Sequence, residues 1–422
     1  MNKRQSYDLD ENIRQDLTAD GHFAGVEADQ EERYLLEPFD PEQISIDTKL
    51  VTMDTLIRRL IQGTIRLAPA FQRNDIWDLE RKSRLIESLM LKIPLPMFYV
   101  SADEKGNWDV VDGLQRLTTI KEFILGNDFL KTRDEVSRGK GFRLQNLEFW
   151  GDEYNKSKFN ELPQILINRI FETEFRFTII NPGTPEEVKR NIFKRINTGG
   201  MPLTSQEIRH ALYQGKSTEL LKELVENDDF KKAINNSVDD SRMAARELIL
   251  RFLAFSVRSY KDYPKSDMDK FLSDTMRLIN IMPELPNREL KKIFKDSNIP
   301  SLRFSDIEIL KKRFKEGMKR SHNLFGDHTF RKSFGNKRRS PINKTLFEVW
   351  GNLLADLDED DFECMRLNKN NFIQEYHGKL SDQDFGNLIS RDSWKYSGVQ
   401  LRYKKLKEVI DHHIEKQEIQ KC

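Results

Sequence analysis

Apolar residues recur every three or four positions in two early segments of the chain, which is the spacing of one face of an α-helix. In residues 53–62 this stripe consists of Leu56, Ile57, Leu60 and Ile61. In residues 79–93 it consists of Leu85, Ile86, Leu89, Met90 and Ile93, with Pro94 and Pro96 directly after it. Because proline cannot continue a helix, the pattern predicts two helices, the second of which ends near residue 93.

A change to strand-like patterning follows. Residues 97–102 and 108–111 are predicted strands, and the polar residues 104–107 between them are typical of a turn. The second strand leads into Asp112-Gly113 and then into a helix that is expected to end near Leu125. Residues 174–180 alternate apolar and polar side chains, which predicts a third strand.

Two helix starts follow the third strand. Thr184-Pro-Glu-Glu187 and Thr204-Ser-Gln-Glu207 each place a threonine three residues before a glutamate, which is the capping-box pattern. From the second box onward most of the chain has helical periodicity. We therefore predict an α+β fold with a mixed α/β domain over residues 48–210 and a mostly helical domain over residues 211–422.

The composition indicates a soluble protein with a highly charged surface. Of the 422 residues 33% are charged and 37% are hydrophobic, and no apolar stretch approaches the roughly 20 residues that span a bilayer. We therefore expect no membrane association. The two cysteines, Cys364 and Cys422, form no C-x-x-C pair, so the sequence predicts neither a disulfide framework nor a zinc finger. A reducing, cytoplasmic location fits this cysteine usage.

The net charge of +1 conceals two oppositely charged segments. Residues 1–48 carry thirteen acidic and four basic residues, and residues 1–47 are expected to be a flexible acidic extension. Residues 331–344 hold basic side chains and no acid, and they are the DNA-binding candidates Arg331, Lys332, Lys337, Arg338, Arg339 and Lys344. The alternative is an ordinary solvated surface. A further hypothesis is that the acidic segment shields this basic stretch when DNA is absent.

The turn after the second strand holds the strongest candidate chemistry. A helix N-terminus presents unpaired N–H groups to an anion, and Gly113 lets the backbone approach a ligand closely. Gln115 and Arg116 lie in the first turn of the helix, and Arg116 could bind a phosphate through two parallel hydrogen bonds. Asp112 could hold Mg²⁺ or position a water molecule. Taken alone, however, the string also fits an ordinary strand-to-helix turn.

Two further strings give this turn a context. Pro69-Ala-Phe-Gln-Arg73 supplies a second glutamine–arginine pair, Gln72 and Arg73, about 40 residues upstream. Residues 193–209 contain Asn197 and a Gly199-Gly200 loop ahead of the second capping box. Glycine-rich loops before helices can bind phosphates, although most are simple connectors.

In their order and spacing, these three strings resemble the N-terminal domain family of GmrSD-type restriction endonucleases. The resemblance is strongest over residues 50–255. It implies a ParB/sulfiredoxin-like fold, binding and hydrolysis of an NTP (ATP or GTP) with Mg²⁺ through a D-G-Q-Q-R motif, and a role in defence against phage or foreign DNA. The motif falls on Asp112, Gly113, Gln115 and Arg116 as catalytic or nucleotide-binding residues, and Gln72, Arg73 and Asn197 complete the nucleotide-binding set.

One residue departs from the motif, because Leu114 occupies the position of its first glutamine and cannot hydrogen-bond a phosphate. Larger proteins that resemble this one also carry an H-N-H nuclease domain. None of the histidines after residue 300 lies in such a context, and His412-His413 is expected to be solvated. DNA cleavage is therefore expected from a partner effector. The alternatives are a DNA-binding module without catalysis and a metal-dependent ParB-like nuclease. The sequence leaves the oligomeric state open.

Overall fold

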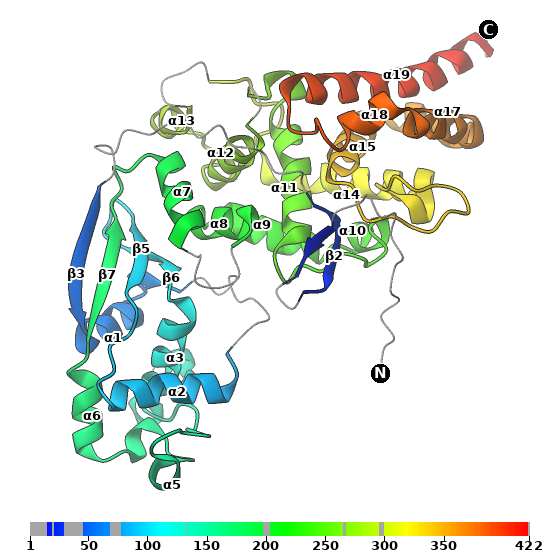
Figure 1. Cartoon of the computed structure of the whole chain (residues 1–422). Coiled ribbons are helices and arrows are strands. Elements are labelled where there is room, and N and C mark those ends of the chain that lie inside the picture. The colour runs from blue at the N-terminus through cyan, green and yellow to red at the C-terminus, as the bar shows by residue number, and fades with distance from the viewer. Residues whose placement is uncertain are drawn as a thin grey trace. The chain divides into compact units, whose positions relative to one another are not determined.

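The computed structural model describes residues 15–18, 21–28, 45–67, 77–132, 134–196, 203–264, 267–294 and 299–420. The chain divides into two compact units. Residues 35–203 form one, here called the sheet unit, and residues 1–34 together with 204–422 form the other, here called the helical unit. The boundary lies at residues 203/204, whereas the sequence pattern placed it near residue 210. Figure 1 labels many of the elements of both units.

The sheet unit is built on a five-stranded mixed sheet with the order β3-β7-β5-β6-β4. Edge strand β3 runs antiparallel to β7, and β5 runs parallel to β7 but antiparallel to β6. The short β4 at the other edge runs parallel to β6. The strands are β3 (Ile46–Thr52), β4 (Ile65–Arg66), β5 (Phe98–Ala102), β6 (Trp108–Asp112) and β7 (Glu174–Ile180).

Aromatic side chains fill the core of the sheet unit. The rings of Phe98 on β5 and Phe177 on β7 are stacked with their centroids 5.0 Å apart, and both side chains are fully buried. Phe175 meets Phe98 edge-on at 5.7 Å. Helices cover this core, with α2 packed against α3 and α6. The helices are α1 (Met53–Gln62), α2 (Leu79–Met90), α3 (Leu114–Leu125), α4 (Asn127–Thr132), α5 (Gly151–Tyr154), α6 (Gln164–Phe171) and α7 (Glu186–Ile196).

Several predicted elements of the sheet unit are confirmed. Helix α1 and strand β7 have the predicted bounds, and the hairpin of β5 and β6 lies where the alternating pattern placed it. Helix α2 ends at Met90, three residues before the predicted end. The Thr52 side chain caps α1 by accepting a hydrogen bond from the Thr55 amide, and Gly63 ends this helix in a left-handed conformation.

Strand β3 was absent from the prediction because its side chains show little alternation. Val51 is its one buried residue, so apolar residues do not recur at every second position of this edge strand. Thr184 has a partner that the sequence did not indicate, and its capping box with Glu187 stays a prediction because the Glu187 side chain is not among those described. Its hydroxyl donates to the carbonyl of Ser45 and accepts from the amide of Ser45, so it joins the start of β3 to the turn after β7.

The helical unit surrounds α11 (Ala244–Val257), of which almost every residue is buried. The capping box at the start of α8 (Ser205–Leu212) is confirmed, with Thr204 and Glu207 bonded reciprocally. None of the helices in the described ranges combines the length and apolar character that crossing a bilayer requires. The other helices are α9 (Lys216–Val225), α10 (Asp228–Ala233), α12 (Met268–Asn280), α13 (Asn287–Phe294), α14 (Ile307–Phe325), α15 (Lys344–Asp356), α16 (Glu359–Leu367), α17 (Lys369–Ser381), α18 (Gln383–Leu388) and α19 (Tyr396–Gln420).

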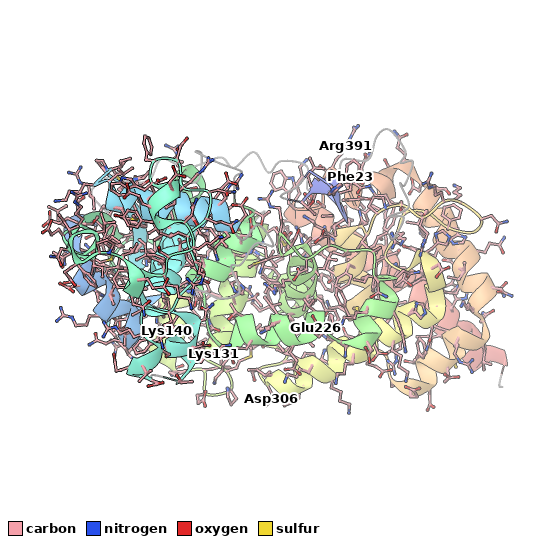
Figure 2. The ribbon with its side chains drawn as sticks, turned by 90° about the horizontal axis from the view of Figure 1, so that it is seen from below. Phe23, Lys131, Lys140, Glu226, Asp306 and Arg391 are labelled. Carbon is pink, nitrogen blue, oxygen red and sulfur yellow. The ribbon has the colours of Figure 1, made fainter. Side chains whose placement is uncertain are left out.

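Part of the acidic N-terminal segment is a folded hairpin of the helical unit. Strands β1 (Gln15–Leu17) and β2 (Phe23–Glu27) pair antiparallel. The side chains of Ala24 and Val26 are buried in the core of this unit, and Val26 forms a β-bridge with Ile342. The side chain of Phe23, which Figure 2 labels, is instead 58% exposed. The expectation of a flexible extension over residues 1–47 therefore does not hold for this hairpin, because its apolar residues supply burial that a disordered segment lacks.

Candidate functional site

The turn between β6 and α3 requires glycine. Gly113 is the N-cap of α3 and has a φ of 92°, in the left-handed region. A Cβ atom at this position would lie 2.3 Å from Cδ1 of Phe98, far closer than van der Waals contact. Both the backbone conformation and the space therefore exclude a larger side chain. This places the start of α3 directly against the aromatic core of the sheet.

The first turn of α3 provides backbone donors. Its first intrahelical bond runs from the amide of Leu117 to the carbonyl of Gly113, over 2.9 Å. The three preceding helical amides, of Leu114, Gln115 and Arg116, have no carbonyl within the helix to bind. Among the described residues, no side chain caps this terminus. Together with the positive end of the helix dipole, these amides favour an anion at the turn.

Arg116 is already bound to three oxygens of the sheet unit. Its two terminal nitrogens donate to the carbonyls of Pro96 and Met97 and, over 3.0 Å, to a carboxylate oxygen of Asp112. The guanidinium also lies over the ring of Phe98, with its central carbon 4.4 Å from the centroid. Burial lowers the pKa of Arg116, and the charge of Asp112 partly offsets this effect. Arg116 thus links the residues directly before β5 to the turn that carries Asp112.

The neighbouring motif residues are more accessible. The Asp112 side chain is 36% exposed. Gln115 is half-buried, and its side-chain amide forms no hydrogen bond within the described part of the chain. Leu114 packs against the edge of the hydrophobic core, so this leucine contributes to packing at the position where the motif has a glutamine. The structure thus brings together Asp112, Gln115 and Arg116 at one helix start.

The second glutamine–arginine pair and Asn197 lie outside the described residues, and their placement at the site remains a prediction. The strand that leads to Gln72 and Arg73 is described, and an ion pair holds it. On β4, Arg66 donates from Nε and Nη2 to the two carboxylate oxygens of Asp109, both over 2.7 Å. Because β4 and β6 are parallel, β4 runs toward the end of the sheet at which Asp112 lies.

The basic stretch 331–344 separates into buried and exposed side chains. Arg331 and Lys344 are 4% and 5% exposed. Arg331 binds the carbonyls of Ser340 and Ile234 and the hydroxyl of Ser237. The DNA-binding role predicted for Arg331, Lys332 and Lys344 does not fit these positions, because each is held by protein partners. Lys337, Arg338 and Arg339 lie instead on the loop between the bridged residues 331 and 342, where the first two are exposed and the third is half-exposed.

Acidic residues of the N-terminal hairpin pair with the half-buried Lys332 and the buried Lys344. Lys332 Nζ lies 2.7 Å from a Glu27 carboxylate oxygen, and Lys344 Nζ lies 2.9 Å from one of Asp16. The Asn343 side chain donates to the same Glu27 oxygen over 2.8 Å. The acidic segment and the basic stretch therefore do meet. Since these contacts are part of the folded core, they indicate a structural role rather than a removable cover.

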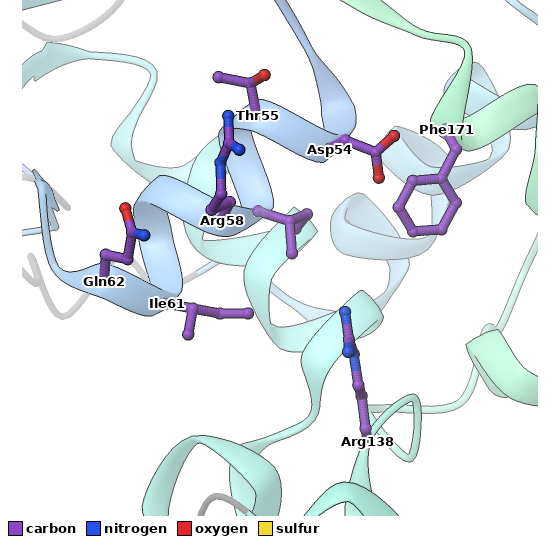
Figure 3. Close-up of a pocket in the computed structure, with 8 residues that line it drawn as sticks. Asp54, Thr55, Arg58, Ile61, Gln62, Arg138 and Phe171 are labelled. Carbon is purple, nitrogen blue, oxygen red and sulfur yellow. The ribbon is translucent and has the colours of Figure 1, made fainter.

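A separate cavity of about 590 Å³ opens beside α1 in the sheet unit. Figure 3 shows Arg58 on α1 and Arg138 on a separate segment that faces it, and Arg138 also pairs with Glu135 over 3.4 Å. The lining mixes two guanidinium groups with the carboxylate of Asp54 and three apolar side chains, so charge alone does not select a polyanion. None of the predicted site residues lines this cavity. It is lined by Asp54, Thr55, Ile57, Arg58, Ile61, Gln62, Arg138 and Phe171.

Comparison with protein families identifies the segment that holds the Asp112–Arg116 turn. Residues 55–214 match the model of the GmrSD restriction endonuclease, N-terminal domain. This segment is therefore similar to the GmrSD N-terminal domain. The matched segment includes the whole motif turn as well as α8 of the helical unit, so it extends past the sheet unit. No curated protein and no solved structure matches the chain.

Proposed function

We propose that this protein is the NTP-binding and NTP-hydrolysing component of a DNA restriction or anti-phage system. The observation that carries the proposal is the left-handed Gly113 at the uncapped start of α3, flanked by Asp112 and Gln115, inside the segment that is similar to the GmrSD domain. The mixed sheet with helices is compatible with the ParB/sulfiredoxin-like fold that we assign to this domain. DNA sensing and a partner effector that cuts the DNA are part of the same proposal.

In this proposal the backbone amides and the accessible side chains have different roles. The amides at the start of α3 bind the phosphates, as helix N-termini do in other nucleotide-binding proteins. Gln115, whose amide is free within the described residues, orients the attacking water. Gln72, Arg73 and Asn197 complete the phosphate contacts in this proposal. Because Leu114 replaces a polar side chain of the motif, we expect slow turnover.

Arg116 acts as a positioning residue in this scheme. It fixes the carboxylate of Asp112 against the turn through a 3.0 Å hydrogen bond while its other donors hold the entry of β5. Its charge also adds to the positive potential at the start of α3. A direct contact between Arg116 and a phosphate requires that the phosphate replace one of these protein oxygens.

The residues at the turn fit Mg²⁺ bound together with a nucleotide. Such ions are usually held by one or two carboxylates, with phosphates and water completing the shell. Asp112 supplies one partly exposed carboxylate beside the phosphate-binding amides. When bound, Mg²⁺ would neutralise charge on the phosphates.

Phosphate release from ATP and from GTP, with and without duplex DNA, tests the proposal. We expect Mg²⁺-dependent release by the wild type and at least tenfold slower release by Asp112→Asn and by Gln115→Ala. Arg176→Ala, which removes an exposed arginine on β7, is the matched control and should retain wild-type turnover. Absence of both nucleotide binding and release in the wild type would reject the proposal.

The basic loop favours a second candidate function, DNA binding without turnover. Lys337 and Arg338 are exposed on one short loop, and the Lys337 ammonium lies 4.2 Å from the centroid of the Phe334 ring. Cations on a loop with an aromatic neighbour suit phosphate backbones and bases. DNA binding with no phosphate release would favour this candidate, and metal-dependent nicking by the isolated chain would favour the nuclease alternative.

A further inference from the structure

Two histidines and a glutamate of the helical unit meet at a single point. On α19, Nδ1 of His412 lies 2.9 Å from Oε2 of Glu375, which is on α17. Nε2 of His413 lies 3.1 Å from the same oxygen. The three ligand atoms all lie within 4.8 Å of one another. The sequence pattern indicated a solvated histidine pair, but it gave no signal that Glu375 would face it from another helix.

Packing between α17 and α19 holds the cluster in place. His413 is 3% exposed, and its ring meets that of Phe372 edge-on, with centroids 5.7 Å apart. The His412 side chain is 48% exposed, so one side of the cluster is open to solvent. A buried ligand, a half-buried ligand and an exposed ligand together form a site that is fixed by the fold yet accessible to an ion.

We propose that Glu375, His412 and His413 bind a zinc-class divalent transition metal ion. Two imidazole nitrogens and one carboxylate oxygen form a donor set that zinc uses when it keeps a fourth position open for water or a ligand. With metal–ligand bonds of 2.0–2.1 Å, tetrahedral geometry separates the ligand atoms by roughly 3.3 Å. The two histidine nitrogens lie a few tenths of an ångström closer to the Glu375 oxygen than this, so small movements along these two contacts bring them to the distance that the ion requires.

Asn368 is the outer partner of the buried ligand. Its side-chain nitrogen lies 3.3 Å from Nδ1 of His413, so in this state Nδ1 accepts and Nε2 donates to Glu375. A metal bound at Nε2 requires the proton on Nδ1, which then needs an acceptor. Rotation of the Asn368 amide by half a turn supplies its carbonyl oxygen, provided that the Asn371 amide, which donates to that oxygen over 2.7 Å, turns as well. An aspartate at this position would supply an acceptor without rotation, so Asn368→Asp should tighten metal binding.

Titration of the metal-free full-length chain with Zn²⁺ alone, followed by calorimetry, tests the site. We expect one ion per chain and at least tenfold weaker binding by His412→Ala and by Glu375→Gln. Neither substitution removes a fully buried side chain, so both variants should fold. His22→Ala, which removes an exposed histidine of the N-terminal hairpin, is the matched control and should bind as the wild type does.

Co²⁺ gives a second readout that reports geometry. A tetrahedral site with nitrogen and oxygen ligands gives visible absorption bands, which should appear with the wild type and with His22→Ala but not with His412→Ala. Absence of zinc binding by the wild type would overturn the proposal and leave the cluster as a hydrogen-bonded His–Glu–His bridge. Equal binding by wild type and both cluster variants would overturn it as well. The result is independent of nucleotide binding, which involves other residues.

Discussion

The guanidinium of Arg116 lies over the ring of Phe98, with its central carbon 4.4 Å from the centroid, and joins the start of α3 to the entry of β5. Stacking of this kind leaves the edge of the guanidinium free to donate, and here three protein oxygens occupy it. The arginine of the motif therefore stabilises the turn that presents the helix amides. Its contribution to folding and its contribution to ligand binding should be separable.

Arg116→Ala should lower the free energy of unfolding by about 2–3 kcal/mol, because it removes hydrogen bonds from a charged group and leaves the Asp112 carboxylate without its partner. Nucleotide affinity should fall as well, by about 1.5–3 kcal/mol. Urea unfolding and calorimetric nucleotide titration measure the two effects. Arg176→Ala should change stability by less than about 0.5 kcal/mol. Loss of affinity with unchanged stability would instead identify Arg116 as a direct phosphate ligand that does not position the turn.

Gly113→Ala should destabilise the sheet unit by more than about 1 kcal/mol, since the variant must adopt a left-handed backbone and also displace the ring of Phe98. Thermal unfolding measures the loss. A double-mutant cycle with Phe98→Leu separates the two causes, because a smaller side chain at position 98 relieves the contact but not the backbone strain. If the two substitutions change the free energy of unfolding additively, contact with the Phe98 ring contributes nothing to the destabilisation by Gly113→Ala.

Much of this site could be predicted from the sequence because its determinants are local. A strand that ends in Asp112-Gly113 followed by an apolar helical stripe specifies both the turn and the helix start. The partners of Arg116 could not be predicted, because Pro96 and Met97 contribute backbone carbonyls that leave no trace in side-chain patterns. Edge strand β3 was missed for a related reason, since exposed strands lack alternation.

The basic stretch shows a second limit of sequence patterns. Charge alone cannot distinguish Lys337, which is exposed on a loop, from Lys344, which is buried beside Asp16. The acidic partner lies more than 300 residues away in the chain. Burial of Ala24 and Val26, not the surrounding acidic composition, decides that the hairpin folds. The burial of Lys344 is a consequence of that long-range packing.

His210, which is buried, and Asp240, which is 19% exposed, should give opposing pH dependence in the helical unit. Burial, together with the charge of Arg246, lowers the pKa of His210 to about 4. The stability that neutral His210 contributes is present above its unfolded pKa of about 6.5 and is lost as the pH falls toward 4. Burial raises the pKa of Asp240 to about 6, although Arg246 opposes this shift. The contribution of Asp240 to the stability of the folded state therefore grows as the pH falls from about 6 to its unfolded pKa of about 3.9.

In Asp240→Asn, the loss of stability that protonation of His210 causes should become visible. The substitution removes the carboxyl group whose contribution to stability increases as the pH falls. Relative to wild type, the variant should lose about 2 kcal/mol more stability between pH 7 and about pH 4.5. Urea unfolding at the two pH values measures this difference. The Asp240→Asn/His210→Gln double variant should return the pH dependence toward that of wild type. Identical pH dependence in wild type and Asp240→Asn would contradict the assignment.

Neutralising the exposed loop should weaken DNA binding and reduce its salt dependence. Replacing Lys337, Arg338 and Arg339 by alanine removes up to three phosphate contacts, each of which contributes about 0.9 to the slope of log K against log salt. Fluorescence anisotropy with a labelled duplex at several salt concentrations measures the slope. The matched control replaces three exposed lysines of α14, Lys312, Lys315 and Lys319. Equal slopes for both variants would show that the loop has no specific role.

Glu27→Gln distinguishes a structural hairpin from a removable shield. The Glu27 carboxylate accepts hydrogen bonds from Lys332 and Asn343, so neutralising it should lower the free energy of unfolding by about 1.5–3 kcal/mol. DNA affinity should stay unchanged, because Ala24 and Val26 hold the hairpin through buried contacts that do not depend on this charge. Urea unfolding and anisotropy measure the two quantities. Higher DNA affinity with unchanged stability would instead support shielding, since it would mean that Glu27 masks Lys332 without stabilising the fold.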